Sequence, residues 1–110
     1  MIEQTLEQWR KEGKKKFGED ISNWKFVCPA CKKISSVGDF EKLGAEVDDA
    51  YQNCIGRFNG KGKPPSGDNP DGCDWASYGL LGTCGKGRLI KHSNDRVTAV
   101  FDFAEEKKGD

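Results

Sequence analysis

Residues 24–33 read WKFVCPACKK, and this stretch places two cysteines, Cys28 and Cys31, directly after a short apolar run. A Cys-x-x-Cys pair can be a redox couple, half of a disulfide framework or half of a metal site. A thioredoxin-type pair lies between a strand and a long helix, whereas here lysines and a second short run, 34–37, follow. The odd number of cysteines, five, fits a disulfide framework poorly. A strand, two thiolates on a turn and a returning strand instead predict a zinc knuckle.

A tetrahedral zinc ion needs two further ligands, for which the candidates are Cys54, Cys73, Cys84 and His92. Cys54 ends a stretch with apolar residues at helical spacing, so we expect it on the buried face at the end of a helix. Cys73 directly follows a Gly- and Pro-rich stretch. We therefore predict one structural zinc ion with ligand spacing C-x2-C-x22-C-x18-C, bound by Cys28, Cys31, Cys54 and Cys73. Cys84 and His92 remain alternatives to Cys73 as the fourth ligand.

The composition predicts one small domain with a thin core. The chain has 110 residues, of which 35% are hydrophobic and 33% charged, so hydrophobic burial alone provides little stability. Zinc binding contributes on the order of 10–16 kcal/mol in zinc-finger peptides and would supply what such a core lacks. We expect a single zinc-stapled domain over 1–104, with a flexible Gly- and Pro-rich loop at 59–72 and a frayed, charged tail at 105–110.

The residues before the knuckle predict an amphipathic helix. Thr5 and Gln8 have the spacing of a capping box, which places the start of the helix there. One narrow apolar stripe then contains Ile2, Leu6, Trp9, Gly13 and Phe17. Gly13 lies in the middle of this stripe, where the missing side chain would let another segment approach closely.

The remaining elements predict an α+β fold. We expect a strand at 21–27, a return strand at 34–37, and a second helix from 39 that breaks or kinks at Gly44. A C-terminal hairpin is expected from 88–91 and 96–103, with alternate residues on one face: Val97, Ala99, Phe101 and Phe103. The predicted architecture is a small zinc-knuckle or treble-clef-like domain with two helices, a small antiparallel sheet and this hairpin.

Charge and motifs exclude several classes of function. The formal net charge is zero, from 18 basic and 18 acidic residues, whereas proteins of duplex DNA usually carry a large basic excess. The Gly-rich run 82–87 is not a phosphate-binding loop of Walker type, because Leu80 replaces the required glycine and Gly87 follows Lys86. The sequence contains no recognisable catalytic triad or paired-carboxylate motif. We therefore expect a non-enzymatic protein.

The order of short motifs along the chain resembles a family of small proteins encoded by phages, prophages and other mobile elements of bacteria. The motifs are TLEQWRKEGKKKFG, WKFVCPAC, SVGDFEKLG, AYQNCIGR, GCDW and VFDFA. The recurring cysteines of that family fall on Cys28, Cys31, Cys54 and Cys73. This chain departs from the family at Lys32, where a glycine is usual, and in the 82–87 insert. The resemblance implies a cytoplasmic protein of a bacterial host cell but no defined activity.

Two functions follow as hypotheses. The first is a zinc-stabilised binding protein that engages a host protein or complex, for example as an inhibitor of a bacterial defence system. The second is a zinc-finger protein that binds nucleic acid through the basic first helix and the knuckle lysines. Candidate partner-binding residues for the two are Arg10, Lys14, Lys32, Lys33, Trp75, Tyr78, Lys86 and Arg88. A start without a basic and apolar leader predicts a cytoplasmic location, and no membrane partner is expected.

Overall fold

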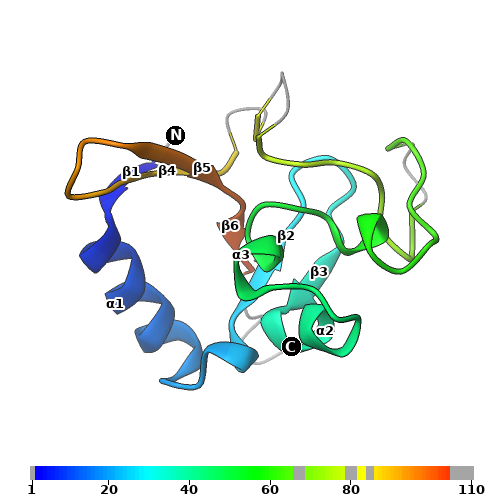
Figure 1. Cartoon of the computed structure of the whole chain (residues 1–110), viewed down its shortest axis with the longest axis horizontal. Coiled ribbons are helices and arrows are strands. Elements are labelled where there is room, and N and C mark those ends of the chain that lie inside the picture. Colours follow the sequence, from blue (N-terminus) through cyan, green and yellow to red (C-terminus); the bar gives the residue numbers. More distant parts are fainter. Residues whose placement is uncertain (1, 66–68, 79–81, 84–85, 105–110) are drawn as a thin grey trace, which may run out of the picture.

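A computed structural model describes residues 2–65, 69–78, 82–83 and 86–104 of the chain. The described part forms an α+β domain with three α-helices, two 3-10 helices and two three-stranded sheets (Figure 1). The elements in chain order are β1 (Ile2–Thr5), α1 (Leu6–Phe17), η1 (Ile21–Asn23), β2 (Lys25–Val27), β3 (Ile34–Ser36), α2 (Val37–Lys42), α3 (Val47–Ala50), η2 (Ile55–Arg57), β4 (Arg88–Lys91), β5 (Val97–Val100) and β6 (Asp102–Phe103).

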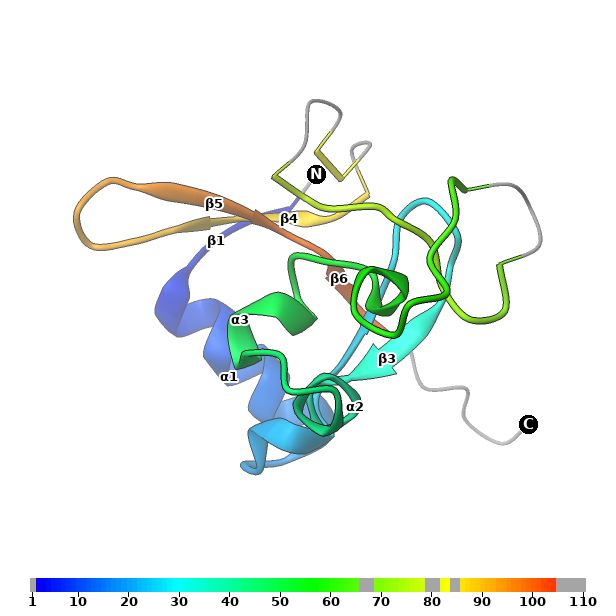
Figure 2. The ribbon, with the colours of Figure 1, turned by 45° about the vertical axis from the view of Figure 1, so that its right-hand side comes forward.

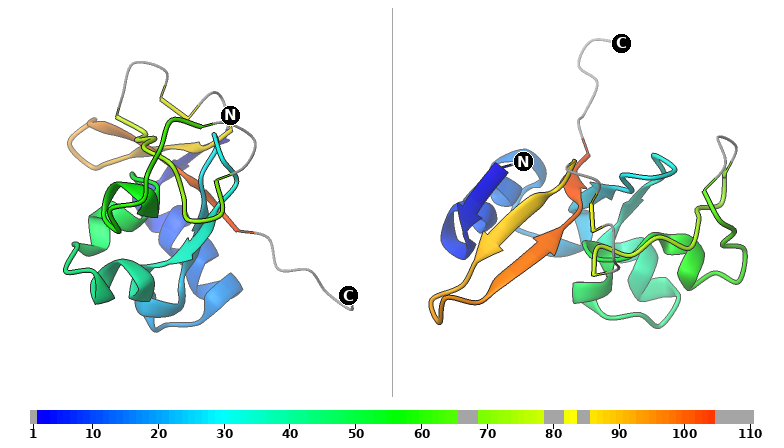
Figure 3. Two further views of the ribbon diagram at one scale, coloured as in Figure 1. Left: turned by 90° about the vertical axis from the view of Figure 1, so that its right-hand side faces the viewer. Right: turned by 90° about the horizontal axis from the view of Figure 1, so that it is seen from above.

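The first sheet joins the two ends of the chain in the order β1-β4-β5. β1 pairs in parallel with β4, with Ile2 opposite Arg88, and β4 pairs antiparallel with β5. The predicted C-terminal hairpin is therefore confirmed. A strand at Ile2–Thr5 was not expected, because the prediction placed Ile2 on the apolar stripe of the helix. In Figure 3 this sheet lies beside α1.

The second sheet has the order β3-β2-β6 and carries the knuckle between β2 and β3. β6 follows β5 almost directly, so the last strands pass from one sheet to the other (Figure 2). The backbone N–H of Phe101, at this crossing, donates to the carbonyl of Tyr51 at 2.7 Å. The predicted one-faced alternation over 97–103 is wrong for this reason: Val97 is 54% exposed, whereas Val100 and Phe101 are buried.

The start and the buried face of α1 follow the sequence prediction. The Thr5 hydroxyl accepts from the backbone N–H of Gln8, and the Gln8 side chain accepts from the backbone N–H of Thr5, at 3.1 and 2.9 Å. Trp9 and Gly13 are buried. A Cβ at Gly13 would lie 2.4 Å from the Trp24 ring, so glycine is required for this approach. The close contact predicted from Gly13 is confirmed, and it fixes α1 against the chain that enters β2.

Aromatic rings fill the core between α1 and the second sheet. Trp9 stacks with Phe26 and Phe103, at centroid distances of 6.1 and 5.7 Å, and meets Trp24 edge-on. Phe26 and Phe103 are themselves stacked at 5.3 Å across the β2–β6 pair. Large rings bury much apolar area for each residue, which compensates for the low apolar content of the chain.

Arg88 was predicted to bind a partner, but the structure places its side chain inside the domain. Its side chain is only 5% exposed and lies between α1 and the end of the second sheet. It binds the carboxylates of Glu12 at 2.5 Å and Asp102 at 2.7 Å, and it lies over the Phe103 ring. The hydrogen bond from Arg88 lowers the pKa of Glu12. Arg88 thus links α1, β4 and β6.

Two other predictions of secondary structure need correction. The segment 21–27 is a 3-10 turn, η1, followed by the shorter strand β2. The second helix is two separate helices, α2 and α3, so the described part has three α-helices and not two. α3 ends at Ala50, and Cys54 lies beyond its end while remaining buried. The predicted break at Gly44 is confirmed, since Gly44 adopts a φ of 78° between the helices.

The described parts of the 59–72 loop pair with each other and with the chain that follows the loop. The Asn59 side chain donates to the carbonyl of Asp71 at 2.8 Å, and Lys63 forms a β-bridge with Cys73. Residues 66–68, the predicted frayed tail at 105–110 and Cys84 lie outside the described residues. Within the described part, no helix is both long and apolar enough to cross a membrane.

Candidate metal centre

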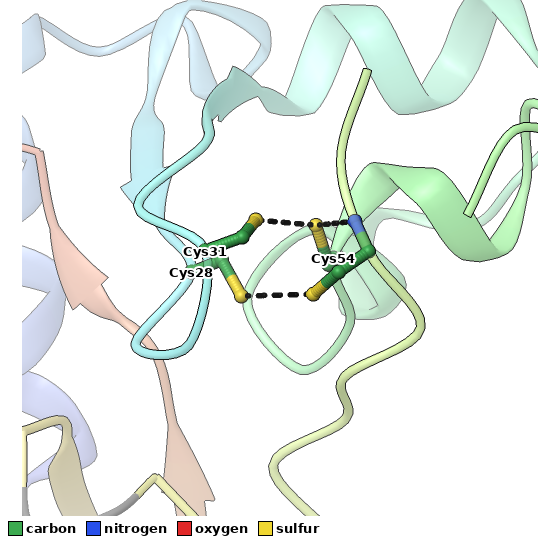
Figure 4. Close-up of side chains that lie close together, drawn as sticks. Cys28, Cys31 and Cys54 are labelled. Atoms are coloured by element: carbon green, nitrogen blue, oxygen red, sulfur yellow. Dashed lines mark hydrogen bonds between the residues drawn. The ribbon is translucent and has the colours of Figure 1, made fainter. Parts of the chain in front are cut away.

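Three separate segments bring four cysteines together. Cys28 and Cys31 lie on the turn between β2 and β3, Cys54 immediately precedes η2, and Cys73 follows the long loop. Their four Sγ atoms all lie within 4.8 Å of one another. Figure 4 shows the side chains of the three labelled cysteines converging. The four residues predicted from spacing are therefore the four that the fold assembles, and together they can hold a metal ion.

The four cysteines are free thiols, and two of the distances between their sulfurs match those around a tetrahedral ion. The Sγ atoms of Cys28 and Cys73 are 3.7 Å apart, as are those of Cys31 and Cys54. A disulfide would require about 2.05 Å. Four thiolates about 2.3 Å from one zinc ion lie about 3.8 Å from each other. The two pairs thus have the length expected for edges of a metal-centred tetrahedron.

The knuckle turn is held by backbone hydrogen bonds on either side of its cysteines. The N–H of Cys28 donates to the carbonyl of Lys33, and the N–H of Lys32 donates to the carbonyl of Cys28, both at 3.0 Å. Lys32 has a φ of 69°, in the left-handed region that favours glycine. Its Nζ donates to the carbonyl of Pro29 at 3.2 Å. The turn therefore forms although a lysine stands where the resembling family usually has glycine.

Two glycines position the other pair of cysteines: Gly72, where the sequence predicts a turn before Cys73, and Gly56, to which the sequence prediction gave no role. A Cβ at Gly56 would lie 2.4 Å from the carbonyl oxygen of Cys73. Gly72 has a φ of 99°, and a Cβ there would meet the backbone N of Gly56 at 2.6 Å. The close approach lets the N–H of Cys73 donate to Cys54 Sγ at 3.1 Å. The sequence signal was available, because each glycine lies within two residues of a cysteine.

The electrostatics of the site favour a bound cation. The Cys28 thiol, together with backbone N–H groups of Cys73 and Gly56, lowers the pKa of Cys54 to about 5. Burial raises the pKa of Cys73 to about 12, and the hydrogen bond with Cys54 raises that of Cys28. The cluster therefore stabilises the thiolate of Cys54 but disfavours the thiolates of Cys28 and Cys73 unless a positive ion compensates them. A metal ion supplies that compensation.

The alternative fourth ligands are not part of the described cluster. His92 lies at the end of the hairpin, where its Nε2 makes a 2.9 Å hydrogen bond with Thr98 Oγ1. Cys84 lies outside the described residues. Within the described residues, these four cysteines are the group of side chains that lie close enough together to bind one metal ion.

The predicted partner-binding residues lie on different parts of the molecule. Arg10 and Lys14 are exposed on α1. On the knuckle turn, Lys32 is exposed and Lys33 is half-buried. Figures 1 and 3 place α1 and this turn on different sides of the domain. Lys86 is exposed, next to the buried Arg88. These residues therefore do not form one continuous basic surface.

The two aromatic candidates lie next to the metal centre. The carbonyl of Trp75 accepts from the N–H of Cys54 at 3.0 Å, while its indole Nε1 donates to the carbonyl of Gly82 at 2.7 Å. Tyr78 is 64% exposed, and its hydroxyl donates to Asn53 Oδ1 at 2.6 Å. The Arg57 guanidinium lies 5.9 Å from the centre of the Tyr78 ring. An exposed aromatic and a cation are thus fixed beside the cysteines.

Comparison with known proteins identifies one family for this chain. Searches of curated proteins and of solved structures found no match. The model of the family described as VVA0879-like matches residues 5–104, which includes all four clustered cysteines and nearly the whole described domain. The chain therefore belongs to the VVA0879-like family.

Proposed function

We propose that this protein is a non-enzymatic binding domain stabilised by one structural zinc ion, which is bound by Cys28, Cys31, Cys54 and Cys73. The observation that supports the proposal is the group of four sulfurs within 4.8 Å of one another, in which two pairs have the separation expected around a tetrahedral ion. Catalytic zinc sites keep one coordination position for water or substrate, whereas all-cysteine sites use every position for the protein. The ion would join three separate segments of the chain, and its binding energy would be folding energy.

The surface next to the metal centre is the proposed protein-binding surface, formed by Arg57, Trp75 and Tyr78. Tyr, Trp and Arg are the residues most enriched at the energetic centres of protein interfaces. Here they are held rigidly, because Arg57 donates to the carbonyl of Asp74 at 2.8 Å and Trp75 accepts from Cys54. Binding would therefore depend on the metal even though the partner does not touch it.

The proposed partner is a protein or complex of a bacterial host cell, reached in the cytoplasm after expression from a phage or another mobile element. Inhibition of a defence nuclease is one specific form of this proposal. It is supported by the resemblance of the motif order to such proteins, and by an exposed aromatic that has a rigid support and no role in the core.

Affinity capture from bacterial lysate tests the proposal. The tagged wild-type protein should retain a defined host protein that a Tyr78→Ala/Arg57→Ala variant retains at least tenfold less. Lys42→Ala, an exposed basic residue on α2, serves as the control and should retain it fully. Treatment with EDTA should release the partner. Equal capture by wild type and the double variant, or no specific capture from several hosts, would contradict the proposal.

A second candidate function, binding of nucleic acid, is favoured by one specific observation. An open groove of about 880 Å³ runs between α1 and the β4–β5 turn, and its lining includes the basic residues Arg10, Lys11, Lys14 and Lys91. Phosphate contacts by such residues give an affinity that falls steeply with salt. An oligonucleotide titration from 50 to 200 mM salt should show this loss; binding that does not change with salt would exclude phosphate recognition.

A further inference from the structure

The groove beside α1 has two walls that come from different parts of the chain. One wall is α1 itself, from Leu6 to Lys14, which is about 12 Å of helix axis. The other wall is the β4–β5 turn, including Lys91 and Asp95, which lies beside the start of α1 (Figure 1). An extended chain can therefore run along the helix with protein on both sides of it.

Two of the four lysine and arginine residues that line the groove are only weakly neutralised. Lys11 lies 3.7 Å from the carboxylate of Glu7, and Lys91 lies 3.9 Å from that of Asp95. The side chains of both pairs are largely exposed, and exposed ion pairs contribute little to stability. Both lysines can therefore exchange their carboxylate for another anion at little cost.

The other two basic residues of the groove, Arg10 and Lys14, are exposed and form no ion pair within the described residues. They lie four positions apart on α1, so they share one side of the helix and are about 6 Å apart along its axis. This distance is close to the separation of successive phosphates along one nucleic-acid strand. The pair is therefore spaced to contact two neighbouring phosphates of a strand that runs beside α1.

The lining of the groove favours a phosphate backbone over a protein segment. Among the described residues that line it, Leu6 is the one hydrophobic side chain. Protein partners gain most of their binding energy from aromatic and other large anchors in well-packed pockets, whereas phosphate contacts depend on charge. A groove with four basic residues and one apolar residue matches the second kind of partner.

The second wall favours a single strand over a duplex. Duplex DNA is a stiff rod, with a persistence length of about 150 base pairs, and its major groove admits one α-helix or one β-ribbon. Here the β4–β5 turn lies beside α1, so the helix is not free to enter a major groove alone. A single strand is thinner and more flexible, and its backbone can follow a short groove between two walls.

We propose that the groove binds the phosphate backbone of a single nucleic-acid strand without reading its bases. Neighbouring phosphates would lie near Arg10 and Lys14, with Lys91 on the opposite wall. The inference rests on the second candidate function, since it specifies the form of nucleic acid that would bind. Each phosphate contact with a single strand contributes about −0.7 to the slope of log affinity against log salt, so two to four contacts give a slope of about −1.4 to −2.8. Affinity should then fall about sevenfold to about fiftyfold between 50 and 200 mM salt.

Fluorescence anisotropy of the metal-loaded protein tests the proposal with a labelled twenty-residue DNA strand of mixed sequence and with the same strand annealed to its complement. At 50 mM salt the single strand should bind at least about fivefold more tightly than the duplex, although charge density alone favours the duplex. A strand of unrelated sequence should bind within about twofold, because the bases are not read. An RNA strand of the same sequence distinguishes the two sources of a single strand, and tighter binding of either one supports the proposed site.

Matched variants locate the site. Lys14→Ala should reduce the steepness of the salt slope by about 0.7, which corresponds to one phosphate contact. Lys91→Ala should reduce it to a similar degree, because the strand lies between both walls. Lys15→Ala, exposed on the same helix but outside the groove, should leave the slope unchanged. All three side chains are exposed, and a melting curve for each variant checks that it is folded.

The results that would overturn the inference can be told apart. If the duplex binds as tightly as the single strand or more tightly, and Lys14→Ala still reduces the salt slope, the preference for a single strand is refuted and the nucleic-acid candidate survives. If neither form binds at protein concentrations up to about 1 mM, both fail. Equal slopes for Lys14→Ala and Lys15→Ala would refute the location. Tighter binding of a ten-residue oligoglutamate than of the DNA strand would assign the groove to an acidic protein segment instead.

Discussion

Replacing Arg88 by methionine tests how the two sheets and α1 are held together. The guanidinium is 5% exposed and binds two carboxylates, which are themselves 28% and 36% exposed. Breaking a fully buried ion pair costs about 3–5 kcal/mol. Because Glu12 and Asp102 can regain water after the substitution, we expect a smaller loss, about 2–3 kcal/mol of unfolding free energy. For a domain with a thin core, this is a large fraction of a total of roughly 5–15 kcal/mol.

Urea unfolding of the metal-loaded protein, followed by tryptophan fluorescence, measures this loss. Lys91→Met is the matched control, because Lys91 lies on the same strand and pairs with Asp95 at the surface, with both side chains largely exposed. Exposed pairs contribute about 0–1 kcal/mol, so this variant should stay close to the wild type. If Arg88→Met and Lys91→Met have the same midpoint, the buried network does not hold the fold as described.

Three further predictions concern stability. The hydrogen bond from Arg88 lowers the pKa of Glu12 in the folded protein, so the ionised Glu12 stabilises the fold above the pKa of an unfolded glutamate, about 4.3, and this stabilisation is lost as the pH falls below it. In Arg88→Met, the stability should therefore fall less between neutral and acidic pH than in the wild type. Parallel acid unfolding curves would contradict the pairing. Gly13→Ala should lower the free energy of unfolding by about 1–3 kcal/mol, because the new Cβ would overlap the Trp24 ring. This loss should exceed the gain from the better helix propensity of alanine. An unchanged or higher melting temperature would show that the ring can move away. Lys32→Gly should stabilise the metal-loaded form by about 0.5–1 kcal/mol, because glycine adopts the left-handed φ at this position without strain. A loss of stability would show that the hydrogen bond from Lys32 to Pro29 contributes more than the strain costs.

The sequence was sufficient for features that depend on nearby residues or on the chemistry of cysteine. The capping box at Thr5 and the break at Gly44 are local, so their signals lie within a few residues. Gly13 was informative because a glycine on an apolar stripe implies a close neighbour. The four clustered cysteines were predicted because a tetrahedral site needs a complete set of ligands, and spacing left few combinations.

Features that depend on distant partners were missed. β1 is a parallel strand paired with β4 from the other end of the chain, and Ile2–Thr5 carries no local pattern that distinguishes it from the start of a helix. Arg88 was predicted to belong to a basic, partner-binding patch, and only the fold brings Glu12 and Asp102 beside it. The alternation after Val97 failed because the chain changes sheets at Phe101, which no period in the sequence reveals.

The most direct measurement is the zinc content and zinc coordination of the purified, unchelated protein, by elemental analysis and X-ray absorption spectroscopy. From the proposed zinc site we expect one equivalent of zinc with four sulfur neighbours at about 2.3 Å, and a large fall in thermal stability when the ion is removed. Less than about half an equivalent of metal, a mixed shell of sulfur and nitrogen, or a melting curve unaffected by chelation would contradict a tetrathiolate staple.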